Sequence, residues 1–314
     1  MHANEAIMDM DPYDFDDLWD YGDPAGTAEK LRELLPEAEA SGDDEYRLQL
    51  LIQLARTHSL RGELDAAHEI LDRVEPQLSD ATPVARIRYL LERGRSFNSA
   101  GEKDKAHARF IEAWDMGRDL RADFFAVDAA HMVAIAAGGD EGLEWNLKAI
   151  DFANASDQPR ARNWLGSLYN NTGWSYHDRG EFEKALALFE GALQFREEQG
   201  NAETIRIAQW CVARCLRSLG RVDEAFEIQQ AILIENETAG AADGYTHEEL
   251  GELLLLMGQP DEASPHFAEA YAVLSQDAWL MENEAERIAR MRRMGEDSPI
   301  HPSIWGVSRR FSLI

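Results

Sequence analysis

The apolar residues of this chain recur with helical spacing in pairs of segments. The segment IAQWCVARCLRSLG is typical of the first member of a pair and GEFEKALALFEGAL of the second, with apolar residues at i, i+3, i+4 and i+7. A glycine lies between the two members, and glycine readily adopts the left-handed conformation that ends a helix. The pattern therefore predicts a repeated unit made of a helix, a tight turn and a second helix.

Six copies of the second segment follow one another along the chain, one of them degenerate. A small residue five places after the turn marks each copy, and the steps between copies are 39, 36, 43, 40 and 38 residues: Ala67, Ala106, Gly142, Ala185, Ala225 and Ala263. Another small residue lies twelve places earlier in each copy, where we expect two helices to approach closely: Ala55, Gly94, Ala130, Gly173, Ala213 and Gly251. We expect irregular stacking at the degenerate copy, which has Gly142 and Asn146 at the usual small and aromatic positions.

The unit resembles the tetratricopeptide repeat (TPR), with W-x2-L-G-x2-Y in its first helix and A-x3-F-x2-A in its second. The best copy carries Tyr169, Thr172, Gly173, Tyr176, Gly180, Ala185, Phe189 and Ala192. The resemblance covers roughly residues 43–275, and its long steps are similar to the extended repeats of kinesin light chains and bacterial peptide-sensing regulators. It implies an all-α, right-handed superhelical solenoid of about six repeats, whose first helices line a concave groove that binds protein or peptide.

Four further segments flank the repeat array, which we place at residues 43–275. They are an acidic-aromatic N-terminal segment (1–22), an N-terminal capping helix (23–42), a C-terminal capping helix (276–295) and a C-terminal tail (296–314). Asp23 followed by Pro24 is typical of a helix start. The acidic-aromatic segment either orders on docking to a partner or packs Phe15, Leu18 and Trp19 under the first repeat, and we favour the packing interpretation.

The charge of the chain narrows the class of partner. With 31 Lys and Arg against 59 Asp and Glu, the formal net charge is −28, which argues against nucleic-acid binding. No apolar stretch is long enough to span a membrane. The first residues contain neither a basic leader nor an apolar run, so we expect a cytoplasmic protein of bacterial type. The acidic beginning and basic end allow self-association through the tail, but the overall negative charge slightly favours a monomer.

The resemblance implies that the residue after each small first-helix residue faces the groove, together with residues one turn away. The arginines of this predicted groove indicate an acidic ligand, because guanidinium groups bind carboxylates in a bidentate fork. Its asparagines would hold the backbone of a peptide. The alternative is that the arginines lie on solvated helix faces and pair with nearby glutamates. No lysine lies in the predicted groove, which argues against recognition of chaperone tails. The candidate groove residues are Arg56, Arg95, His131, Asn170, Asn171, Trp174, His177, Trp210, Arg214 and Arg217.

Catalytic motifs are missing from the sequence. It contains no nucleophile elbow, phosphate loop, dinucleotide fingerprint or zinc-protease motif, so we expect no enzyme and no cofactor. Cys211 and Cys215 are interpreted as small buried hydrophobes, and His68 and His107 as surface histidines, rather than as metal ligands. The sequence predicts a non-catalytic interaction scaffold or adaptor. The alternative is a peptide-responsive regulatory protein whose superhelix changes shape when the ligand binds.

Overall fold

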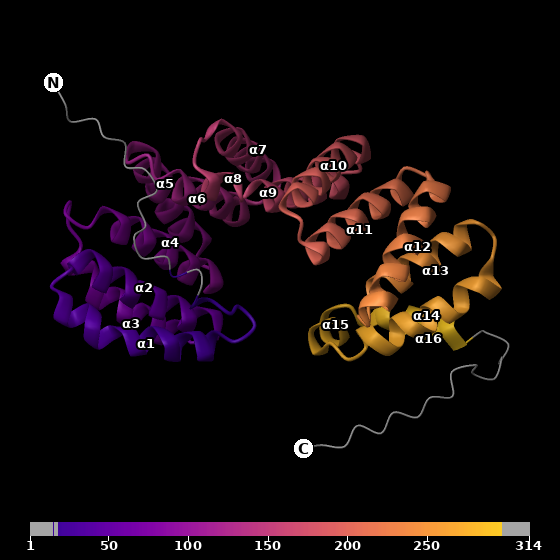
Figure 1. The fold of residues 1–314 in the computed structure, drawn as a ribbon, viewed down its shortest axis with the longest axis horizontal. Helices are drawn as coiled ribbons and strands as arrows, with labels where there is room; N and C mark the ends of the chain where they lie inside the picture. The colour runs from indigo at the N-terminus through magenta and orange to yellow at the C-terminus, as the bar shows by residue number, and fades with distance from the viewer. Residues whose placement is uncertain (1–14, 16–17, 297–314) are drawn as a thin grey trace, which may run out of the picture. The chain divides into compact units, whose positions relative to one another are not determined.

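The computed structural model describes residue 15 and residues 18–296, and this part of the chain is built of helices without strands (Figure 1). The predicted all-α class is confirmed. The elements are α1 (Pro24–Ser41), α2 (Asp44–Leu60), α3 (Leu64–Val74), the 3-10 helix η2 (Glu75–Gln77), α4 (Pro83–Ser99), α5 (Lys103–Asp119), α6 (Asp123–Ala137), α7 (Gly139–Ala155), α8 (Pro159–Arg162), α9 (Leu165–Asp178), α10 (Phe182–Gln199), α11 (Ala202–Ser218), α12 (Val222–Ala239), α13 (Gly244–Leu256), α14 (Pro260–Leu274), α15 (Ala278–Asn283) and α16 (Ala285–Glu296).

The chain forms two compact units, Met1–Ser175 (unit 1) and Tyr176–Ile314 (unit 2). In unit 1 each helix from α1 to α7 packs on a neighbour in the chain, and the first helices also pack side by side, α2 on α4 and α4 on α6. In unit 2 the helices from α10 to α14 pack in order. Helix pairs stacked in this way are the architecture of an all-α repeat solenoid. By their position in the sequence, the predicted repeats correspond to the successive pairs α2–α3, α4–α5, α6–α7, α9–α10, α11–α12 and α13–α14, and the boundary between the units falls within α9.

The turns inside the repeats are made by the predicted glycines. Five of them have φ between 72° and 78°, in the left-handed region where a side chain is strained. In each turn the glycine N–H donates to a backbone carbonyl of the helix that ends there. The glycines are Gly62, Gly101, Gly180, Gly220 and Gly258.

The predicted close approach of the two helices is confirmed in two repeats. A Cβ atom on Gly94 would lie 2.4 Å from the ring of Phe110, and one on Gly251 would lie 2.9 Å from the ring of Phe267. Both phenylalanines are fully buried and lie sixteen places after their glycine. The missing side chain of the first helix therefore makes room for the aromatic ring of the second.

Two repeats carry a polar residue at the position of this ring. Asn146 and Gln229 lie sixteen places after Ala130 and Ala213, and both are buried. Within the described part of the chain, neither the nitrogen nor the oxygen of the Gln229 side chain has a hydrogen-bond partner. A buried polar group without a partner costs roughly 1–3 kcal/mol. Gln229 is thus a weak point in the core of unit 2.

Replacing Gln229 with leucine is expected to raise the free energy of unfolding by about 1 kcal/mol, because the variant no longer buries an unsatisfied amide. Leucine is the residue at the same place in the first repeat, where Leu71 follows Ala55 by sixteen positions. Urea denaturation measures the change. Gln194→Leu on the exposed face of α10 is the matched control and should leave stability nearly unchanged. A less stable Gln229→Leu protein would contradict the prediction.

Helix α1 and the segment before it cover the first repeat. Asp23 caps α1 by accepting a hydrogen bond from the backbone N–H of Gly26, as its sequence predicts. Phe15 is buried in a cluster with Leu31 of α1 and Leu50 of α2. The described part of the acidic-aromatic segment therefore packs on the repeats, and residues 1–14, 16 and 17 of that segment lie outside the described residues.

The predicted single C-terminal helix over residues 276–295 is two helices, α15 and α16, so this detail of the prediction is wrong. Glu284 between them has non-helical backbone angles. The side-chain amide of Asn283 donates to the carbonyl of Trp279, a local bond that competes with helix formation. Helix α16 packs on α14 and buries Ile288 and Met291 against the cluster around Phe267. The tail from residue 297 onward lies outside the described residues. No helix in the described part combines the length and the apolar character that crossing a membrane requires.

Candidate functional site

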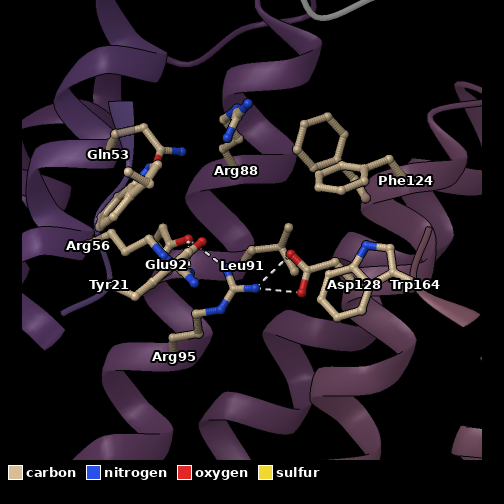
Figure 2. Close-up of a pocket in the computed structure, with 12 residues that line it drawn as sticks. Tyr21, Gln53, Arg56, Arg88, Leu91, Glu92, Arg95, Phe124, Asp128 and Trp164 are labelled. Atoms are coloured by element: carbon tan, nitrogen blue, oxygen red, sulfur yellow. Dashed lines mark hydrogen bonds and ion pairs between the residues drawn. The ribbon is translucent and has the colours of Figure 1, made fainter. Parts of the chain in front are cut away.

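A pocket of about 100 Å³ lies on the first-helix face of unit 1. Tyr21, which precedes α1, lies on one side of the pocket, and Phe124 and Trp164 lie on the opposite side (Figure 2). Trp19 also lines the pocket and stacks on Tyr21, so these two rings form one wall. The remaining lining residues are Gln53 and Arg56 of α2, Arg88, Leu91, Glu92 and Arg95 of α4, and Phe125 and Asp128 of α6.

Helical periodicity brings these residues together. The α4 residues 88, 91, 92 and 95 follow the pattern i, i+3, i+4 and i+7, so they share one face of the helix. Residues 53 and 56 of α2, and 125 and 128 of α6, have the same spacing. Because α2, α4 and α6 pack side by side, the three faces form one continuous surface.

A chain of ion pairs crosses this surface from helix to helix. Arg56 of α2 contacts Glu92 of α4 at 2.9 Å, and Arg95 contacts the same Glu92 oxygen at 2.5 Å. Arg95 also donates to both oxygens of Asp128 on α6, at 2.5 and 2.6 Å. Burial by itself would lower the pKa of Arg95, but the carboxylates of Asp128 and Glu92 outweigh it and raise that pKa. Arg95 is therefore held as a cation between two buried carboxylates.

The aromatic wall before α1 is fixed to α2. The indole N–H of Trp19 donates to the side-chain oxygen of Gln53 at 2.9 Å. The rings of Trp19 and Tyr21 stack with their centroids 5.2 Å apart. The guanidinium of Arg56 lies 5.6 Å from one ring and 5.7 Å from the other, within the range of a cation–π contact. These contacts hold both rings at the edge of the pocket.

Unit 2 repeats the same kind of ion pairing. Arg214 and Arg217 of α11 both contact Glu249 of α13, at 3.2 and 2.7 Å. Burial acts to lower the pKa of Arg217, and its hydrogen bonds and charge interaction with Glu249 raise it overall. On the other side of α13, Arg287 and Arg290 of α16 pair with Glu248 and Glu252.

The predicted groove arginines are thus already paired with carboxylates of this chain. Arg56, Arg95, Arg214 and Arg217 are partly buried, and each contacts an acidic residue on the next first helix. The alternative interpretation, pairing with nearby acidic residues, therefore describes their geometry. The other part of that interpretation, that the arginines are solvated, does not describe their geometry, because these side chains lie between helices. An acidic ligand would have to displace one of the chain's own carboxylates.

The other predicted groove residues lie in several places. His131 is buried beside the ring of Trp164, 5.5 Å between centroids, and burial lowers its pKa. In α9, the amide nitrogen of Asn170 is 3.5 Å from the side-chain oxygen of Asn171, and Trp174 follows one turn later, at the end of unit 1. In unit 2, Nε2 of His177 lies 2.9 Å from the hydroxyl of Ser218. Trp210 lines a separate pocket of about 770 Å³ with Tyr245.

The sequence interpretation missed Gln53, Glu92, Phe124, Asp128 and Trp164, all of which line the pocket. A signal for the acidic residues was present in the repeat alignment. In each case the acid that pairs with a groove arginine lies three places before the groove position of the next repeat: Glu92 before Arg95, Asp128 before His131, and Glu249 before Glu252.

The two cysteines and the two histidines that the sequence singles out lie in surroundings that suit packing or contact with charged side chains. Cys211 and Cys215 are buried, and burial raises the pKa of Cys215 to about 11, which suits a packing role. His68 contacts Arg93 at 2.7 Å, and His107 contacts Glu141 at 3.1 Å. Among residues 15 and 18–296, no three His, Cys, Asp or Glu side chains are grouped to hold a metal ion.

Comparison with known families decides which repeat this is. The model of the tetratricopeptide repeat matches residues 48–73, which lie in α2 and α3, and residues 165–198, which lie in α9 and α10. The chain contains tetratricopeptide repeats. No curated protein sequence matches it.

Solved structures with the same fold include other TPR proteins. The apo form of RapI has a TM-score of 0.68 at 13% identity over 88% of this chain and 83% of RapI. A Signal Transduction ATPase with Numerous Domains (STAND) protein from Pyrococcus horikoshii, which has a tetratricopeptide repeat sensor, has a TM-score of 0.67 at 15% identity, covering 84% of this chain. This TPR protein spans 42% of the length of the STAND protein. A tetratricopeptide repeat protein from Parabacteroides merdae has a TM-score of 0.50 at 15% identity over 90% of this chain and 96% of that one.

Proposed function

We propose that this TPR protein is a non-catalytic interaction module that binds a peptide, or an exposed segment of another protein, on the first-helix face of unit 1. The observation that carries this proposal is the pocket between the Trp19–Tyr21 wall and the Phe124–Trp164 wall. Aromatic residues are enriched where protein surfaces bind partners, because they bury much apolar area at small entropic cost. Four of them facing one another across an open pocket support a binding role.

The volume of the pocket limits what enters it. A cavity of about 150 Å³ accommodates a benzene ring, and this pocket has about 100 Å³. It therefore admits one short side chain, and the rest of a bound segment would lie outside it along α2, α4 and α6. The ion pairs of Arg56 and Arg95 leave no reason to require an acidic partner.

A sensing role is the second candidate. The support for it is that the P. horikoshii protein carries its tetratricopeptide repeats as a sensor. In this alternative a bound peptide alters a second contact of the protein. A partner protein whose affinity for the full chain changes when the peptide is added would favour sensing over simple adaptor binding.

Selection of peptides from a random display library against the full chain tests the proposal. Peptides selected on the wild type should bind the Trp164→Ala variant at least about fivefold more weakly, because truncating an aromatic anchor costs more than about 1 kcal/mol. Trp279→Ala, which alters an exposed tryptophan of α15, is the matched control and should bind normally. Thermal unfolding confirms that both variants are folded. Peptides that bind Trp164→Ala as well as the wild type would refute binding at this pocket.

A further inference from the structure

Two hydrogen-bonding groups in the unit 1 pocket are left without a partner among the described residues. One is the side-chain nitrogen of Gln53, which is 3% exposed. The indole N–H of Trp19 can only donate, so the Gln53 atom that it contacts must be the oxygen. The Gln53 nitrogen is therefore the atom that remains, and it is a donor.

The second group is an oxygen of Glu92, a residue that is 4% exposed. Arg56 and Arg95 both bind its Oε1 atom, whereas Oε2 is buried and has no hydrogen-bond partner in the described structure. Leaving a buried carboxylate oxygen unsatisfied is costly. The described residues that line the pocket thus include one unpaired donor and one unpaired, buried acceptor. A ligand reaches the acceptor when the side chains around Glu92 shift, and a ligand that satisfies both groups must itself contain a donor and an acceptor.

The charges around the pocket argue against an ionic ligand. Its described lining includes the guanidinium groups of Arg56, Arg88 and Arg95, which oppose the entry of a cation. It also includes the carboxylates of Glu92 and Asp128, which oppose the entry of an anion. An uncharged ligand avoids both penalties.

We propose that the pocket recognises an uncharged amide, most simply the carboxamide of an Asn or Gln side chain. The amide oxygen accepts from the Gln53 nitrogen, and the amide N–H donates to Oε2 of Glu92, with the aliphatic part of the side chain between the aromatic walls. Figure 2 labels Gln53 and Glu92 among the residues that line the pocket. This inference rests on the proposed function, because it names the residue class that the bound segment presents. A backbone amide has the same pair of groups, but the small volume of the pocket favours the tip of a side chain.

Small probes test this preference on the full chain. Protein labelled with 15N-tryptophan has eight tryptophans, and Trp19→Phe and Trp164→Phe variants assign the two indole signals of the pocket. Propionamide is expected to shift these two signals saturably and at lower concentration than propionate or propylammonium. N-methylacetamide represents a backbone amide, and tighter binding of that probe would assign the site to the backbone instead of the side chain.

Gln53→Glu inverts the hydrogen bonding at one position with little change in shape. The variant keeps an oxygen for the Trp19 indole and replaces the free donor with a second acceptor, so propionamide should bind about tenfold more weakly. The preference should move toward propylammonium. Gln77→Glu adds the same charge at an exposed position of unit 1 outside the pocket, and it should bind propionamide as the wild type does.

The outcomes separate this inference from the proposed function. Equal shifts by the charged and uncharged probes, no shift by propionamide, or no effect of Gln53→Glu would overturn amide recognition. If library peptides require Trp164 but bind Gln53→Glu normally, peptide binding stands and the amide preference fails. If no library peptide depends on Trp164 while propionamide still binds as expected, the pocket accepts amides and the proposed function fails.

Discussion

Arg95→Ala is expected to lower the free energy of unfolding by about 3–5 kcal/mol, the usual cost of leaving buried charges without their partner. The variant would leave the buried Asp128 without its ion-pair partner and the buried Glu92 with Arg56 alone, since both carboxylates bond to the Arg95 guanidinium in the structure. Urea denaturation of the full chain followed by circular dichroism measures the loss. Because stability in stacked repeats depends on neighbours, the loss should extend beyond α4.

Arg109→Ala is the control for this prediction. Arg109 makes an exposed pair with Glu112 one turn along the same helix, and such surface pairs contribute only about 0–1 kcal/mol. An Arg95→Ala protein that is as stable as Arg109→Ala would show that the ion pairs between first helices do not hold unit 1 together. Adding Asp128→Asn to Arg95→Ala should recover part of the loss, because the unpaired charge is then removed, whereas Glu92 still pairs with Arg56.

Gly94→Ala is expected to destabilise the protein by about 3 kcal/mol, at the upper end of the range for overpacked cores. The new Cβ would lie 2.4 Å from the ring of Phe110, and that ring is fully buried, so it has little space in which to move. Thermal and urea unfolding measure the effect.

A second substitution provides the control for Gly94→Ala. The double variant Gly94→Ala with Phe110→Leu reproduces the pair found in the first repeat, where Ala55 is followed sixteen places later by Leu71. The double variant should lose less stability than the sum of the two single losses, because residues in contact are not additive. Additive losses would show that the two side chains do not compete for the same space.

The repeat architecture could be predicted because its physical causes are local in sequence. Turn glycines, small residues at fixed spacing and apolar periodicity each specify a conformation or a face without reference to distant residues. Gly94 and Gly251 illustrate this, since their phenylalanine partners lie at one constant spacing. The break at Glu284 was missed because the apolar periodicity runs through it, and the side-chain hydrogen bond from Asn283 to the Trp279 carbonyl beside it leaves no mark in that pattern.

The site was harder to predict than the fold. Position in the repeat correctly indicated that Arg56 and Arg95 share a surface, but position does not indicate whether a charge is free. That depends on Glu92 and Asp128, which lie 36 and 33 residues away from the arginines they pair with. The wall made by Trp19 and Tyr21 comes from outside the repeats, so no repeat alignment could place it over α2.

The ion pairs between first helices also make the two edges of a first helix chemically different, so the two directions along the array are distinct. In unit 1, α4 offers Glu92 to the helix before it and Arg95 to the helix after it, so its two edges are not interchangeable. In unit 2 the carboxylates of α13 meet arginines on both sides, because α16 supplies Arg287 and Arg290 without presenting another repeat. A fragment cut after Leu274 would keep every residue of α13 and α14 but lose the groups that neutralise Glu248 and Glu252. A truncated form of this protein that keeps these ion pairs must therefore include α16, and it cannot end with the last helix pair.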